Sequence, residues 1–150
     1  MYDLLADKLA IKAELANDPL DLGLTVLEAD DAVNAVALNL VRTVCQIDRE
    51  TIPASEINKA IDRDEFAALS ASDRQWLGMI TAGGSINPKA GGEVREGLLQ
   101  LFGPATESRA SLTALLTESA SRIVQLYKAG TLSKGDDVTA SDIANARNAT

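Results

Sequence analysis

The apolar residues of this chain recur at helical spacing, and the pattern predicts a series of short amphipathic helices. In residues 2–16 the leucines and isoleucines fall mainly at four-residue intervals, which places them on one face of a helix. Pro19 ends this helix, because the residue before a proline is pushed out of the helical conformation. Residues 20–27, which contain Gly23, are expected to form either a packed connector or a short extended arm.

The clearest helix signal lies in residues 28–47. Its first turn carries three acids, where the positive end of the helix dipole favours them. Eight of the ten residues from 32 to 41 are apolar, so the apolar surface is wider than a single stripe. The helix is therefore expected to be central in its domain or buried against another subunit. Its apolar positions are Val33, Val36, Ala37, Leu40, Val41 and Val44.

Residues 69–127 contain three further apolar-periodic segments and are expected to form the hub against which the flanking helices pack. Paired glycines and a Gly-Pro dipeptide separate these segments, and residues 85–88 are expected to be extended. The segment 106–127 predicts the longest helix. Ser70 and Thr139 each precede an aspartate by three residues, which is the spacing of a capping box at the start of a helix.

Together these patterns predict an all-α fold, a compact bundle of about seven short helices with little or no strand. Ile52 and residues 85–88 contribute at most short extended pieces. At 150 residues the chain is long enough for one domain with a sizeable core. A division is predicted at residue 28, between an acidic N-terminal helix with its connector arm (1–27) and a helical domain (28–150).

Charge is distributed unevenly and argues against nucleic acid as a direct partner. The net charge is −8, and residues 1–31 carry eight acids against two lysines. A nucleic-acid-binding protein needs a basic stripe that displaces counterions from phosphates, and none is evident. The acidic segment is either a solvated helix face or a surface for a basic partner. Because no apolar run approaches a membrane span and the N-terminus lacks a signal-peptide pattern, a soluble protein of a reducing compartment is expected.

The residue types that carry most enzyme chemistry are missing. The sequence has no histidine, which excludes Ser-His-Asp and Cys-His catalytic arrangements and leaves a zinc site unsupported. The glycine pairs lack the spacing of a phosphate-binding loop. Asp62, Asp64 and Glu65 lack the ligand spacing of a calcium loop, so helix-end charge is their expected role. Cys45 is expected to be a small buried hydrophobe, and no catalytic residue, cofactor or metal is expected.

Seven short segments, spread over residues 17–147, carry a family resemblance. They are NDPL (17–20), Arg42-Thr43 followed by Ile52-Pro53, EINKAIDRDEFAALSASDR (56–74), AGGSINP (82–88), EVREGLLQLFG (93–103), SRASLTALLTESASR (108–122) and VTASDIANAR (138–147). In the order and spacing of these segments the chain resembles a family of short helical proteins that tailed bacteriophages encode among their virion-structure genes. The resemblance implies a component of the phage particle or of its assembly, and it brings no catalytic motif.

The expected function is that of a non-enzymatic virion protein, either a head–tail connector or adaptor or a subunit of the tail region, assembled in the host bacterial cytoplasm. The chain would form a symmetric homo-oligomer, with other copies of itself and neighbouring phage structural proteins as partners. The alternatives are an assembly chaperone absent from the particle and a regulatory module that binds a basic partner through residues 1–31. The candidate subunit interface consists of Val33, Val36, Leu40, Val44, Trp76 and Ile86.

Overall fold

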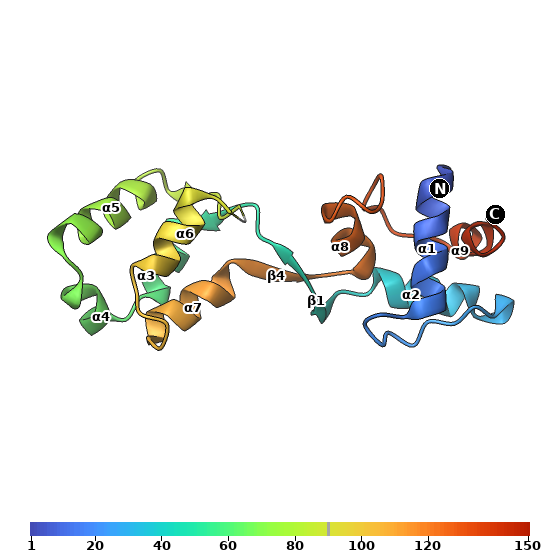
Figure 1. Cartoon of the computed structure of the whole chain (residues 1–150), viewed down its shortest axis with the longest axis horizontal. Helices are drawn as coiled ribbons and strands as arrows, with labels where there is room; N and C mark the ends of the chain where they lie inside the picture. Colours follow the sequence, from blue (N-terminus) through green and yellow to red (C-terminus); the bar gives the residue numbers. More distant parts are fainter. Residues whose placement is uncertain (90) are drawn as a thin grey trace. The chain divides into compact units, whose positions relative to one another are not determined.

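The computed structural model describes residues 1–89 and 91–150, which fall into two compact units (Figure 1). Each unit has its own hydrophobic core. The predicted division at residue 28 coincides with neither boundary between the units. Unit 1 consists of Met1–Ile47 with Ser119–Thr150, and unit 2 consists of Asp48–Glu118.

The prediction of an all-α bundle is wrong. The described part of the chain combines nine α-helices and one 3₁₀ turn with four strands, which form two small antiparallel sheets. Strand β1 (Arg42–Asp48) pairs with β4 (Thr117–Ala120), and β2 (Ile52–Pro53) pairs with β3 (Ser85–Ile86). Along β1 and β4 the chain passes from unit 1 to unit 2 and back.

The predicted helix at residues 28–47 is divided into three elements. The 3₁₀ turn η1 (Glu28–Asp30) leads into helix α2 (Asp31–Asn39), and β1 follows. β-branched residues make up much of β1, and their stiff side chains favour a strand over a helix. The strand also needs β4 as its partner, and β4 lies far along the chain.

The predicted helix at residues 106–127 is interrupted in the same way. Helix α7 (Glu107–Leu115) ends before β4, and α8 (Arg122–Lys128) begins after it. The hydroxyl of Ser121 accepts a hydrogen bond from the N–H of Val124 and so caps α8. Serine and threonine in this region favour caps over helix interiors, because their side chains bond the neighbouring backbone.

In unit 1, helices α1 (Leu5–Asn17) and α2 both pack on α9 (Ala140–Arg147), and α8 also contacts α2. The predicted capping box at the start of α9 is confirmed. Thr139 and Asp142 each accept a hydrogen bond from the other's backbone N–H, at 3.2 and 3.0 Å. The core around these helices includes Tyr2, Ile11, Leu15, Leu38, Ile123 and Ile143.

In unit 2, α3 (Ala54–Ala60) and α6 (Glu93–Gln100) pack on α7, and α5 (Ala71–Thr81) contacts β3. The strands β2 and β3 place Ile52 opposite Ile86 in an antiparallel pair. The predicted hub at residues 69–127 is therefore shared between the units, because residues 119–127 belong to unit 1. The remaining helix of unit 2 is α4 (Arg63–Ala68). None of the helices in residues 1–89 and 91–150 is long and apolar enough to cross a membrane.

Candidate functional site

Unit 1 exposes five large apolar side chains along α2 and the start of β1. Their exposed fractions lie between 49% and 67%. Three of them are spaced three and four residues apart and therefore lie on one side of α2 and its C-terminal end. We call the set the α2–β1 surface; its members are Val33, Val36, Leu40, Val41 and Val44.

The opposite face of α2 explains why these side chains point outward. Asn34 is fully buried, and its amide exchanges two hydrogen bonds with the backbone of Thr25, at 2.7 and 3.0 Å. Asn39 forms the same paired contact with the backbone of Val138, at 2.8 and 2.9 Å. Buried amides need such partners, so the two asparagines fix the inward face of the helix. α2 is thus polar at two inward positions and apolar on its outward side.

The α2–β1 surface has the chemistry of a protein contact. Residues 32–41 contain no charged side chain, so no charge would have to be removed from water when this stretch is covered. Isolated exposed apolar residues are ordinary on a protein surface, whereas a gathered set of them marks an interaction site. The five side chains of the α2–β1 surface are aliphatic and include no nucleophile, acid or base. They can therefore contribute apolar contacts to a partner.

The predicted interface residues divide into two groups in the structure. Val33, Val36, Leu40 and Val44 all belong to the α2–β1 surface of unit 1. Trp76 and Ile86 lie in unit 2. Ile86 is only 6% exposed and belongs to the core of that unit, and Trp76 is half-buried against it.

Trp76 packs tightly on Gly97 of α6, and this contact yields a test of unit 2. A Cβ atom at position 97 would lie 2.5 and 2.6 Å from two carbons of the indole ring. We expect Gly97→Ala to destabilise unit 2 by about 1–3 kcal/mol relative to Gly78→Ala, because the ring must move. At Gly78 in α5 a Cβ meets no atom within 4 Å, so that variant should gain about 1 kcal/mol from helix propensity.

The chain's single tryptophan makes this comparison measurable. Emission of Trp76 should shift to longer wavelength in the Gly97→Ala protein and stay unchanged in the Gly78→Ala protein, with both unfolding midpoints measured in denaturant. An equal gain in stability in the two variants, with unchanged emission in both, would contradict the tight contact.

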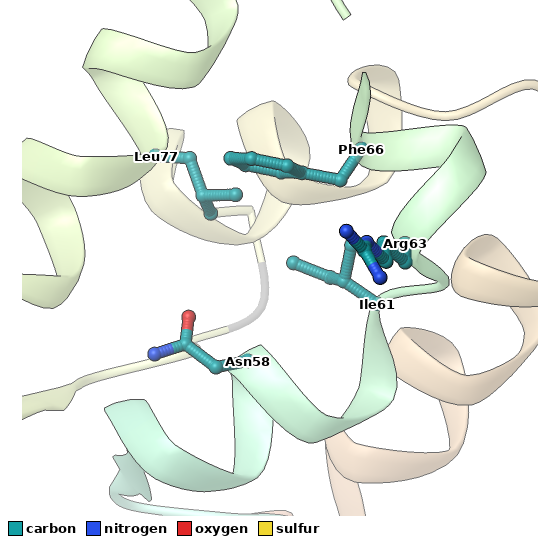
Figure 2. A pocket seen from close by; sticks show the side chains of 5 residues that line it. All are labelled: Asn58, Ile61, Arg63, Phe66 and Leu77. Atoms are coloured by element: carbon teal, nitrogen blue, oxygen red, sulfur yellow. The ribbon is translucent and has the colours of Figure 1, made fainter. Parts of the chain in front are cut away.

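A second feature, absent from the sequence-based prediction, is an open pocket of about 290 Å³ in unit 2. Figure 2 shows Phe66 and Leu77 facing one another across it, with the amide of Asn58 on another side. Ile61 and Arg63 complete the lining. The sequence pattern gives no sign of this cavity, because three separate helices have to converge to form it.

The acidic residues beside this pocket act at helix ends, as predicted for Asp62 and Glu65. The Asp62 carboxylate accepts hydrogen bonds from the N–H groups of Asp64 and Glu65, at 2.9 and 3.0 Å, and caps α4. The Glu65 carboxylate accepts from the N–H groups of Glu107 and Ser108, at 3.0 and 2.9 Å, in the first turn of α7. The hydrogen bonds from Ser108 are the main cause of the lowered pKa of Glu65.

Two arginines of unit 1 form ion pairs with acids, whereas Asp31 Oδ1, Arg42 Nε and Arg147 Nε are buried without a hydrogen-bond partner among the described residues. Arg122 pairs with Glu14, and Arg147 pairs with Asp31. Cys45 is fully buried, and burial raises the pKa of its thiol. Within the part of the chain that the structure describes, no group of three or more His, Cys, Asp or Glu side chains is placed to hold a metal ion.

Comparison of the chain with known proteins found no similar protein or structure. No protein-family model matches the chain, and neither the curated proteins nor the solved structures give a significant match. The α2–β1 surface and the pocket in unit 2 are therefore characterised by their geometry and chemistry alone.

Proposed function

We propose that this chain is a non-enzymatic structural subunit of a tailed-phage particle and that it self-associates through the α2–β1 surface. The observation that supports self-association is the orientation of α2, which turns two asparagines inward and leaves its valines exposed. Covering an apolar surface of this kind removes it from water, and this favours association. Placement in a phage particle rests on the resemblance of residues 17–147 to phage virion-module proteins.

A second copy of the chain is the partner that fits this surface best. Each copy carries a net charge of −8, so two copies repel one another wherever their acids meet. The stretch 32–41 has no charge, and an identical stretch on another copy presents the same small and β-branched side chains. Contact between two such stretches buries apolar surface on both copies without bringing acids together. Such a contact between the same surface on both copies closes a twofold-symmetric dimer, the simplest symmetric homo-oligomer.

Within the particle, the head–tail junction or the tail region is the proposed location. Subunits in these parts associate symmetrically and contact neighbouring proteins. A ring of more than two copies would use a head-to-tail contact in addition to the one between two α2–β1 surfaces. Mass spectrometry of purified particles tests this placement. Stoichiometric recovery of the chain supports a structural role, whereas recovery from infected cells but not from particles would replace it with an assembly chaperone.

Self-association itself is tested by one substitution in the α2–β1 surface. We expect Val36→Asp to lower the association constant more than tenfold, because an unpaired carboxylate would be buried at the contact. Met79→Asp in α5 is the matched control, since Met79 is 62% exposed against 67% for Val36 and lies in unit 2. Mass photometry or sedimentation measures the oligomer in each case. A Val36→Asp protein with the same oligomeric mass as the unsubstituted chain would exclude this surface as the contact.

A further inference from the structure

The pocket in unit 2 combines an apolar interior with a cationic edge. Ile61, Phe66 and Leu77 supply its apolar walls, and Asn58 and Arg63 supply its polar groups (Figure 2). Phe66 lines the cavity and is 38% exposed, whereas Leu77 is buried. At about 290 Å³ the cavity lies at the lower end of the range for small-molecule sites. Its size suits a large side chain better than a whole cofactor.

The charge at this pocket is unbalanced. Among the described residues that line it, Arg63 carries the only charge, and the guanidinium makes no hydrogen bond or ion pair within residues 1–89 and 91–150. The acids on either side of it in the sequence, Asp62 and Asp64, form no ion pair with it among the described residues, and Asp64 is exposed. Asp62 caps α4, and Glu65 is bound to the first turn of α7. Arg63 is therefore free to pair with a carboxylate from outside the chain.

We infer that this pocket binds a segment of another protein in which a large apolar side chain stands next to a carboxylate. The apolar side chain would enter between Phe66 and Leu77, where it is removed from water. The carboxylate would accept paired hydrogen bonds from the guanidinium of Arg63, a geometry that arginine provides and lysine does not. The Asn58 amide both donates and accepts, so it can bond the backbone of the bound segment.

This inference does not depend on the proposed function. It concerns unit 2, whereas self-association is assigned to the α2–β1 surface of unit 1. The two proposals can therefore fail separately.

Two short peptides test the pocket on the full-length chain. Acetyl-Leu-Glu-amide carries the apolar side chain and the carboxylate, and acetyl-Leu-Gln-amide differs only in the charge. In nuclear magnetic resonance titrations of the isotope-labelled protein, we expect both peptides to shift the Asn58 side-chain amide and the Phe66 and Leu77 signals. The glutamate peptide should bind about threefold more tightly, since a partly exposed ion pair contributes little more than that.

Two variants separate the contributions of the walls and of the cation. Arg63→Gln should remove the preference for the glutamate peptide while leaving the spectrum of the free protein otherwise unchanged, because Arg63 is exposed. Phe66→Ala should weaken the binding of both peptides to the same extent. Equal binding of the two peptides to the unsubstituted chain would overturn the carboxylate specificity, and no shift at the pocket up to the solubility limit would overturn the site. Shifts at these residues that depend on protein concentration alone would assign the pocket to a second copy and overturn the inference of a foreign partner.

Discussion

Replacement of Arg122 by methionine is expected to lower the free energy of unfolding of unit 1 by about 3 kcal/mol. Arg122 begins α8, and its Nε and Nη2 atoms donate to the two carboxylate oxygens of Glu14 in α1, both at 2.8 Å. The side chains are only 15% and 11% exposed. The hydrogen bond to Glu14 is also the main reason that the pKa of Arg122 is raised. Without Arg122, the Glu14 carboxylate is left buried with its charge uncompensated.

The control for this prediction is the double substitution Glu14→Gln with Arg122→Met. It removes both charges together, so it should recover a large part of the lost stability, because the main cost of breaking a buried pair is the charge that remains. Hydrogen exchange of the α1 and α8 amides measures the free energy of unfolding of unit 1. Fluorescence of Trp76 reports unit 2 separately and should not change. A double variant no more stable than Arg122→Met would show that the uncompensated charge is not the cause.

Local features of this fold could be predicted from the sequence. The four-residue apolar spacing in α1 and the capping box at Thr139 both involve residues within one or two turns of each other. The role of Asp62 at the start of α4 follows from the same short-range chemistry. Each of these predictions needs only neighbours in the sequence, so the rest of the fold does not alter it.

The short extended pieces expected at Ile52 and at residues 85–88 are confirmed as β2 and β3, but neither their pairing nor the sheet of β1 and β4 could be predicted in this way. The β-branched residues of β1 are compatible with a helix that has a wide apolar face, and the sequence-based prediction followed that alternative. Residues 42–48 form a strand because they hydrogen-bond with β4. In the sequence, nearly all of unit 2 lies between β1 and β4. The same separation explains why the hub at residues 69–127 was expected to be one core.

Four of the six candidate interface residues are exposed on the α2–β1 surface, and the step that the sequence pattern missed concerns the asparagines of α2. Apolar periodicity assigns valines to the inside and asparagines to the outside of a helix, whereas Asn34 and Asn39 bind the backbone at Thr25 and Val138 and lie inward. No pattern within α2 reveals those partners. An asparagine in the middle of an apolar helix is nevertheless a usable signal, because helix interiors disfavour it and a buried amide must find backbone groups to bind.

Replacement of Asp142 by asparagine is expected to lower the free energy of unfolding of unit 1 by about 2–3 kcal/mol at neutral pH. Asp142 is buried, and its carboxylate accepts hydrogen bonds from the backbone N–H groups of Tyr2 and Thr139 and from the Thr139 hydroxyl, at 2.8, 3.0 and 2.7 Å. These bonds tie the first residues of the chain to the start of α9. Asparagine keeps one carbonyl oxygen but loses the charge that strengthens the three bonds.

The same contacts predict how acid affects stability. Burial alone would raise the pKa of Asp142, but the Thr139 hydroxyl and the two N–H groups outweigh it and hold the pKa below its ordinary value of 3.8. A carboxylate whose pKa is lowered on folding stabilises the folded state fully above its unfolded pKa. That stabilisation should disappear as the pH falls below 3.8 and passes through the lower pKa of the folded protein.

Unfolding of unit 1 measured by hydrogen exchange or circular dichroism between neutral and strongly acidic pH should therefore show a shallower acid-side slope in the Asp142→Asn protein. Part of the slope should remain, because Asp18 has a lowered pKa as well: its burial is outweighed by hydrogen bonds from the N–H groups of Leu22, Leu24 and Gly23. Asp136→Asn is the matched control, since that side chain is 79% exposed and its replacement should leave the slope unchanged. An acid-side slope in the Asp142→Asn protein equal to that of the control would mean that the Asp142 carboxylate is not stabilised by folding.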